Sequence, residues 1–95
     1  LAAAFHAWLS AAGFAVRRTG DATGALEALD AGQGFDVVVS DFRLPGALDG
    51  LALLDRVGAR RPAPVRILVS GDIDPALAER ASEAGILGMY PEKQK

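Results

Sequence analysis

The chain has 95 residues, 51% of them hydrophobic and 23% charged, which is the composition of one small globular domain and excludes a disordered chain. The absence of cysteine excludes a disulfide framework and any cysteine-based zinc site. A net charge of −2 argues against direct nucleic-acid binding, and no apolar run approaches the roughly 18 residues that span a membrane, so we expect a cytoplasmic domain.

The first third of the chain is predicted to form a helix, a short strand and a second helix. Apolar residues recur at helical spacing over residues 1–12, in one stripe that includes Trp8. Residues 14–18 are predicted to be a strand near the edge of a sheet, because the last of them are polar. A turn that ends at Asp21 then begins a second helix with its apolar stripe over residues 22–29.

Three apolar runs are predicted to be further strands, at residues 35–40, 65–70 and 86–90. The first two are β-branched, too short for a helix and bounded by turn residues, which is typical of strands buried on both faces of a parallel sheet. Pro-Gly at 45–46 cannot continue the first of these strands.

Two more helices are predicted between these strands. Asp49 is placed to cap the first, and Asp74 followed by Pro75 to open the second, which Gly85 ends. The expected buried residues of the two helices are Leu51, Leu54, Val57, Leu77, Ala81 and Ala84. Helices and strands thus alternate throughout, which predicts a single α/β domain over residues 1–95, a doubly wound parallel sheet between two helical layers.

Polar groups follow three of the predicted strands. Asp41, Ser70 and Lys93 each come at or just after the end of an apolar run, and the carboxyl ends of parallel strands meet at one edge of the sheet. A carboxylate, a hydroxyl and an ammonium group at that edge suit a phosphoryl group, which the first can accept and the others can bind. For each residue taken alone, a turn or a solvated surface position is the competing interpretation.

The combination of these motifs resembles the receiver domain of bacterial two-component response regulators. The resemblance covers essentially the whole chain. The residues that carry it are Val37-Val38-Val39-Ser40-Asp41-Phe42-Arg43-Leu44-Pro45, Asp49-Gly50, Ile67-Leu68-Val69-Ser70-Gly71, Ala84-Gly85, Tyr90 and Lys93.

The resemblance implies a flavodoxin-like fold in which Asp41 accepts a phosphoryl group from a phosphohistidine in a reaction that requires Mg²⁺. It implies that Ser70 bonds the phosphoryl group, that Lys93 pairs with its charge, and that Tyr90 is the aromatic residue that turns inward on activation. Asp41 and the main-chain carbonyl of Arg43 would be ligands of the metal. Arg43 would also influence how readily water reaches the acyl phosphate.

The chain departs from the family pattern in three places. The family's first strand carries a pair of acidic residues that hold Mg²⁺, and both this strand and the closing helix are expected to lie outside the chain, so that it is truncated at both ends. We therefore expect weak Mg²⁺ binding and no phosphorylation of the isolated 95 residues. Because the spacing after Gly85 is one residue longer than usual, Glu92 competes with Lys93 for its position.

Two other functions stay open at this point. One is a pseudo-receiver, an interaction module that keeps the fold without phosphorylation. The other is an aspartate-nucleophile phosphatase of the haloacid dehalogenase type, which is disfavoured because Arg43 occupies the place of that family's general acid.

The expected partner is a sensor histidine kinase or a histidine phosphotransfer domain, and an output domain and a homodimer are also open. The receiver itself is not a conventional enzyme. The sequence over 46–50 and Val69-Ser70-Gly71-Asp72 look most like receivers within hybrid sensor kinases.

Overall fold

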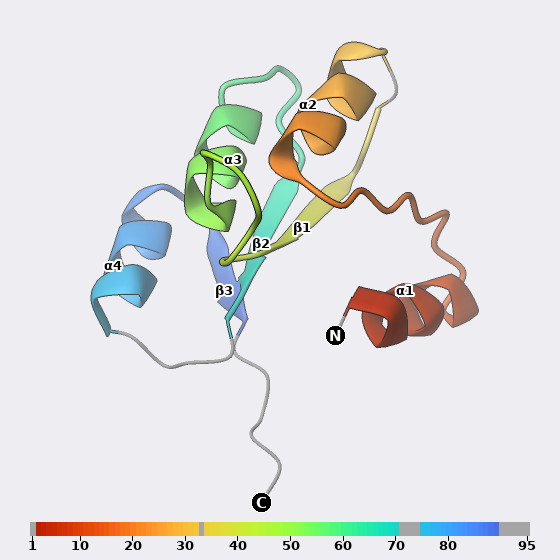
Figure 1. The fold of residues 1–95 in the computed structure, drawn as a ribbon, viewed down its shortest axis with the longest axis horizontal. Coiled ribbons are helices and arrows are strands. Elements are labelled where there is room, and N and C mark those ends of the chain that lie inside the picture. Colours follow the sequence, from red (N-terminus) through yellow and green to blue (C-terminus); the bar gives the residue numbers. More distant parts are fainter. Residues whose placement is uncertain (1, 33, 71–74, 90–95) are drawn as a thin grey trace, which may run out of the picture.

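The computed structural model describes residues 2–32, 34–70 and 75–89, which form a small parallel sheet with helices (Figure 1). The strands β1, β2 and β3 pair in that order, and both pairings are parallel. The elements along the chain are α1 (Ala2–Ala11), α2 (Ala22–Asp30), β1 (Val37–Asp41), α3 (Gly50–Val57), β2 (Val65–Val69), α4 (Pro75–Glu83) and β3 (Leu87–Met89).

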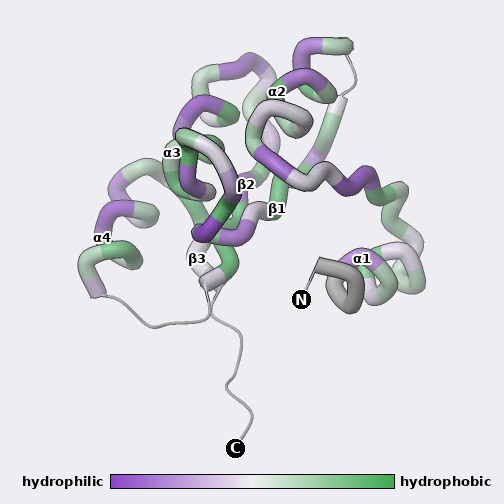
Figure 2. Tube along the Cα trace, in the orientation of Figure 1, coloured by the Kyte–Doolittle hydropathy of each residue, from purple (hydrophilic) through white to green (hydrophobic). Residues whose placement is uncertain are grey.

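The helices α2, α3 and α4 lie on one side of the sheet, where they cover the core. Both α3 and α4 alternate between hydrophobic and hydrophilic segments along their turns (Figure 2). The α3–α4 part of the core has Leu54 and Leu68 at its centre, with 0% and 1% of their surface exposed. A second cluster, around Val57 and Leu53, joins α3 to α2. Of the predicted buried positions, five are confirmed and Ala84 is half-buried against the core.

The first turns of two helices are held by aspartate side chains, of which the sequence predicted the cap at Asp49 and a helix start at Asp21. Asp49 precedes α3 and accepts a hydrogen bond of 2.8 Å from the main-chain N–H of Ala52. Asp21 does the same for α2, with the N–H of Gly24 as donor at 2.8 Å. These bonds satisfy main-chain donors that have no partner within the helix. The corresponding prediction for α4, a cap at Asp74, lies outside the described residues.

The carboxyl-terminal ends of α3 and α4 meet at one arginine of the sheet. The guanidinium of Arg66 in β2 donates a hydrogen bond of 3.0 Å to the carbonyl oxygen of Leu54 and one of 2.9 Å to that of Ala84. A cation at this place suits the negative ends of both helix dipoles. Gly85 has φ of +75° and turns the chain from α4 into β3, as predicted for a helix-ending glycine.

The predicted strand at residues 14–18 is wrong. This segment follows α1 without regular secondary structure and pairs with no strand of the described residues. A strand is stable only when its main-chain groups pair with a neighbour. The edge of β1 that faces away from β2 has no paired strand in the described part of the chain, so nothing brings residues 14–18 into the sheet.

The face of the sheet opposite α3 and α4 is apolar, and we call it the open face (Val37, Val65, Ile67 and Leu87). Val37 pairs with Val65 and Ile67 with Leu87, so these side chains share one face. Val65 is 51% and Leu87 59% exposed. Helix α1 lies beside the sheet in Figure 1, and its Trp8 is 66% exposed, so this residue of the predicted apolar stripe is not buried there.

Candidate functional site

Asp41 is the last residue of β1 and is half-buried at the carboxyl edge of the sheet. The chain leaves the sheet immediately after it, because a loop with Pro45 and Gly46 leads from Phe42 to α3. The main-chain N–H of Phe42 still donates a hydrogen bond of 2.9 Å to the carbonyl oxygen of Val69. The end of β1 is therefore tied to the end of β2.

Ser70 follows β2 directly and lies at the same edge as Asp41. Asp41 is the register partner of Val69, so Ser70 comes one residue beyond that pair. Neighbouring strands are about 4.8 Å apart, a separation that one tetrahedral phosphoryl group can bridge. Both residues are half-buried, which leaves part of each accessible to a reactant. The structure thus brings two of the predicted site residues to adjacent strand ends.

Ser40 is a neighbour of the site that the sequence did not single out. It is 6% exposed, and its hydroxyl donates a hydrogen bond of 2.8 Å to the main-chain carbonyl oxygen of Asp41. A buried hydroxyl without a partner would be unfavourable, so this bond both satisfies Ser40 and restrains the Asp41 main chain. The sequence does contain a signal that could have identified Ser40, because it is a polar residue inside an apolar run and directly precedes Asp41.

The described residues offer few ligands for a divalent cation at this edge. No group of three or more histidine, aspartate or glutamate side chains occurs among them that could hold a metal ion. Asp41 and the main-chain carbonyl of exposed Arg43 are two oxygen donors, while the carboxylate of Asp49 caps α3. Mg²⁺ takes six oxygen ligands, so this set alone does not fit a tight site.

The remaining predicted site residues, Tyr90 and Lys93, lie outside the described residues, as does the competing Glu92. Their placement relative to Asp41 is therefore still a prediction.

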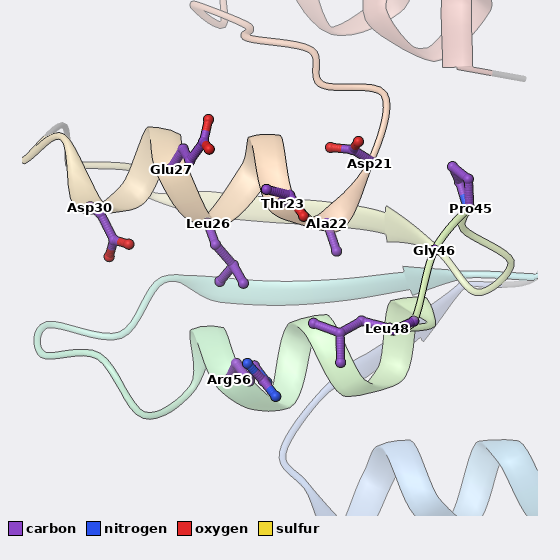
Figure 3. A pocket seen from close by; sticks show the side chains of 11 residues that line it. Asp21, Ala22, Thr23, Leu26, Glu27, Asp30, Pro45, Gly46, Leu48 and Arg56 are labelled. Carbon is purple, nitrogen blue, oxygen red and sulfur yellow. The ribbon is translucent and has the colours of Figure 1, made fainter.

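A hollow of about 600 Å³ lies between α2, α3 and the loop before α3 (Figure 3). Two of the carboxylates that line it have structural partners: Asp21 caps α2, and Asp30 forms an ion pair of 2.7 Å with Arg60. Leu26, which also lines the hollow, points from α2 toward α3. Neither Asp41 nor Ser70 lines this hollow, so it does not extend the candidate site.

Comparison with known proteins identifies the family. The family model for the response regulator receiver domain matches residues 1–91 of the chain. The chain belongs to the receiver domain family of response regulators. It is 44% identical over 78 residues to the transcriptional regulatory protein FixJ of Bradyrhizobium diazoefficiens, which is 81% of this chain and 37% of that relative. The receiver thus spans little more than a third of this curated relative.

Solved structures agree with this identification. A signal receiver domain of an HD domain-containing protein from Pseudomonas fluorescens Pf-5 superposes with a TM-score of 0.79 at 34% identity, over 94% of this chain and 64% of that one. A response regulator protein from Burkholderia pseudomallei gives a TM-score of 0.81 at 22% identity, over 99% and 54%. The flavodoxin-like α/β fold expected from the sequence is confirmed.

Receiver domains are the phosphoacceptor modules of two-component systems, and this general function is confirmed for the chain. Members of the family generally bind Mg²⁺ and act with histidine kinases and output domains. The phosphatase alternative has no support in these comparisons. In the described ranges, the longest helix has ten residues, and none has the length and apolarity to cross a membrane.

Proposed function

We propose that Asp41 is the residue of this receiver that accepts the phosphoryl group. One carboxylate oxygen of Asp41 attacks the phosphorus of a phosphohistidine, a P–O bond forms, and the P–N bond breaks. The imidazole leaves with the electron pair of that bond and takes up a proton, and Asp41 becomes an acyl phosphate. The position of Asp41 at the end of β1, half-buried and tied to β2 beside Ser70, is the observation that supports this assignment.

Three other residues complete the proposed site. The Ser70 hydroxyl donates a hydrogen bond to a phosphoryl oxygen, and the Lys93 ammonium pairs with the phosphoryl charge. Tyr90 changes its position when Asp41 is phosphorylated and so alters the surface that partners bind. The adjacent ends of β1 and β2 support the role of Ser70, while the roles of Lys93 and Tyr90 rest on the family motif.

When bound, Mg²⁺ would neutralise charge on the phosphoryl oxygens. This chain would contribute the Asp41 carboxylate and the Arg43 carbonyl, with water and phosphoryl oxygens as further ligands. Two donors are few for a hard cation, so the described residues by themselves would bind Mg²⁺ weakly and support little phosphorylation.

The phosphoryl donor would be a sensor histidine kinase or a histidine phosphotransfer domain in the cytoplasm. The similarity to FixJ favours a transcriptional regulator with a separate output domain as the whole protein. A receiver within a hybrid sensor kinase and a receiver that dimerises are the alternatives.

The test is phosphorylation of the full-length gene product by a small-molecule phosphodonor, followed by intact-mass measurement with and without Mg²⁺. We expect one added phosphoryl group in the wild type and none in Asp41→Asn. Asp36→Asn is the matched control, because Asp36 is an exposed carboxylate at the opposite end of β1. Equal labelling of Asp41→Asn and the wild type would overturn the assignment. No labelling of any form would favour the pseudo-receiver.

A further inference from the structure

The first residue of α3 lies against the main chain of Asp41. Gly50 is buried, and a Cβ added to it would overlap the carbonyl oxygen of Asp41. The same atom would lie 2.7 Å from the carbonyl carbon of Asp41 and 2.9 Å from the Cα of Phe42. Only glycine allows α3 to begin this close to the candidate phosphoacceptor.

Two hydrogen bonds hold the same stretch of main chain. The N–H of Gly50 donates to the carbonyl oxygen of Phe42 at 2.7 Å, and the hydroxyl of Ser40 donates to that of Asp41 at 2.8 Å. The Ser40 hydroxyl thus holds the peptide between Asp41 and Phe42, and the start of α3 packs against that peptide and holds the next one, between Phe42 and Arg43. Ser40 and Gly50 therefore both restrain the main chain at Asp41.

The atoms that a Cβ at Gly50 would meet are main-chain atoms, which cannot rotate away as a side chain can. A larger residue must therefore shift either the first turn of α3 or the peptide that follows the Asp41 Cα. In the second case the carboxylate moves with its main chain. A displacement of about 1 Å in a reacting group can slow a reaction about 100-fold, so such a shift would slow the chemistry even in protein that is fully folded.

We propose that Gly50 is a positioning residue for phosphoryl transfer. Together with Ser40, it sets the position of the Asp41 main chain. This inference rests on the proposed role of Asp41 as the phosphoacceptor. It adds that the start of α3 and the acceptor strand act as one unit at the site.

The opposite end of α3 provides a matched control. A Cβ added to Gly58 would overlap the guanidinium of Arg66, which is a flexible side chain bonded to the far ends of α3 and α4. Gly58 has φ of −65°, which any residue adopts, and the positive-φ glycines do not include Gly50. Gly50→Ala and Gly58→Ala therefore introduce the same methyl group at the two ends of one helix.

The experiment measures the maximal rate of phosphorylation by a small-molecule phosphodonor, with saturating Mg²⁺, in the full-length protein. Denaturation curves first establish a temperature at which each variant is fully folded. We expect Gly50→Ala to lower the maximal rate at least about tenfold and to leave the donor concentration for half-maximal rate unchanged, while Gly58→Ala stays within about twofold of the wild type. Equal rates for Gly50→Ala and the wild type, or equal losses in both variants, would overturn the proposal.

Ser40→Ala keeps the proposal testable if Gly50→Ala does not fold. It removes the hydroxyl that holds the Asp41 carbonyl and introduces no overlap, and we expect a loss in maximal rate of about threefold or more. A wild-type rate for Ser40→Ala together with an unfolded Gly50→Ala would also overturn the proposal. If the wild type itself takes up no phosphoryl group, the proposed function fails, and this outcome is distinct from all the others.

Discussion

The main-chain N–H of Phe42 donates to the carbonyl oxygen of Val69, and this bond of 2.9 Å fixes where β1 ends relative to β2. Asp41 precedes the donor and Ser70 follows the acceptor. Asp41 and Ser70, the two described residues of the proposed site, therefore lie on either side of the last contact between two parallel strands that pair from Val37–Val65 to Asp41–Val69.

This relationship predicts a defined effect for Ser70→Ala. The variant should fold, because Ser70 is half-buried and lies one residue beyond the end of β2. Loss of one hydrogen bond to a charged phosphoryl group is worth about 1.5 kcal/mol, so phosphorylation should slow about tenfold. Initial rates from a small phosphodonor check this. Ser82→Ala, an exposed serine of α4, is the control, and equal rates in the two variants would remove Ser70 from the site.

The core between α3 and α4 should be sensitive to loss of volume at Leu68. This side chain is 1% exposed and packs with Leu54 and Leu77. Leu68→Ala should lower the free energy of unfolding by about 3 kcal/mol, through lost burial and the cavity that remains. Leu87→Ala, at a position that is 59% exposed, should change it by less than about 1 kcal/mol. Urea denaturation of both variants checks the difference, and similar midpoints would contradict the described core.

Removal of the N-terminal cap of α3 should have a smaller effect on the free energy of unfolding. Asp49→Ala removes the acceptor for the N–H of Ala52 and should lower the free energy of unfolding by about 1 kcal/mol. Asp55→Ala in the same helix is the comparison, because Asp55 is exposed and makes no such cap. A loss in Asp55→Ala as large as that in Asp49→Ala would show that charge rather than capping is responsible.

Arg66 should matter for stability through its two hydrogen bonds. Arg66→Met keeps an unbranched side chain in place of the aliphatic part of Arg66 but leaves the carbonyl oxygens of Leu54 and Ala84 without this donor, which should lower the free energy of unfolding by about 2 kcal/mol. Arg56→Met, at an exposed position of α3, should have little effect. Chemical denaturation measures both, and an unchanged midpoint for Arg66→Met would exclude a role for these bonds.

The sequence predicted the elements whose signals are local. Asp21 and Asp49 each stand at the start of a helix, three residues before the N–H group from which they accept, and Gly85 stands where α4 ends. Asp41 and Ser70 could be placed at one edge because each ends its own apolar run, and parallel strands share an edge. This logic needs only the order of elements along the chain.

The features that the sequence did not predict depend on partners distant in the chain. Residues 14–18 have the composition of a strand, but a strand also needs a neighbour, and composition does not reveal whether one is present. The close approach of Gly50 to Asp41 depends on how the loop between them folds back. The Ser40 hydrogen bond depends in turn on which face of β1 is buried.

The most direct test of the central claim is to locate the phosphoryl group. Borohydride reduces an aspartyl phosphate to homoserine, and peptide mapping of the phosphorylated, reduced full-length protein then identifies the modified position. We predict homoserine at residue 41 and unchanged aspartate at residues 36 and 49. Homoserine at another aspartate, with residue 41 unmodified in protein that carries the phosphoryl group, would contradict the assignment of Asp41 as the phosphoacceptor.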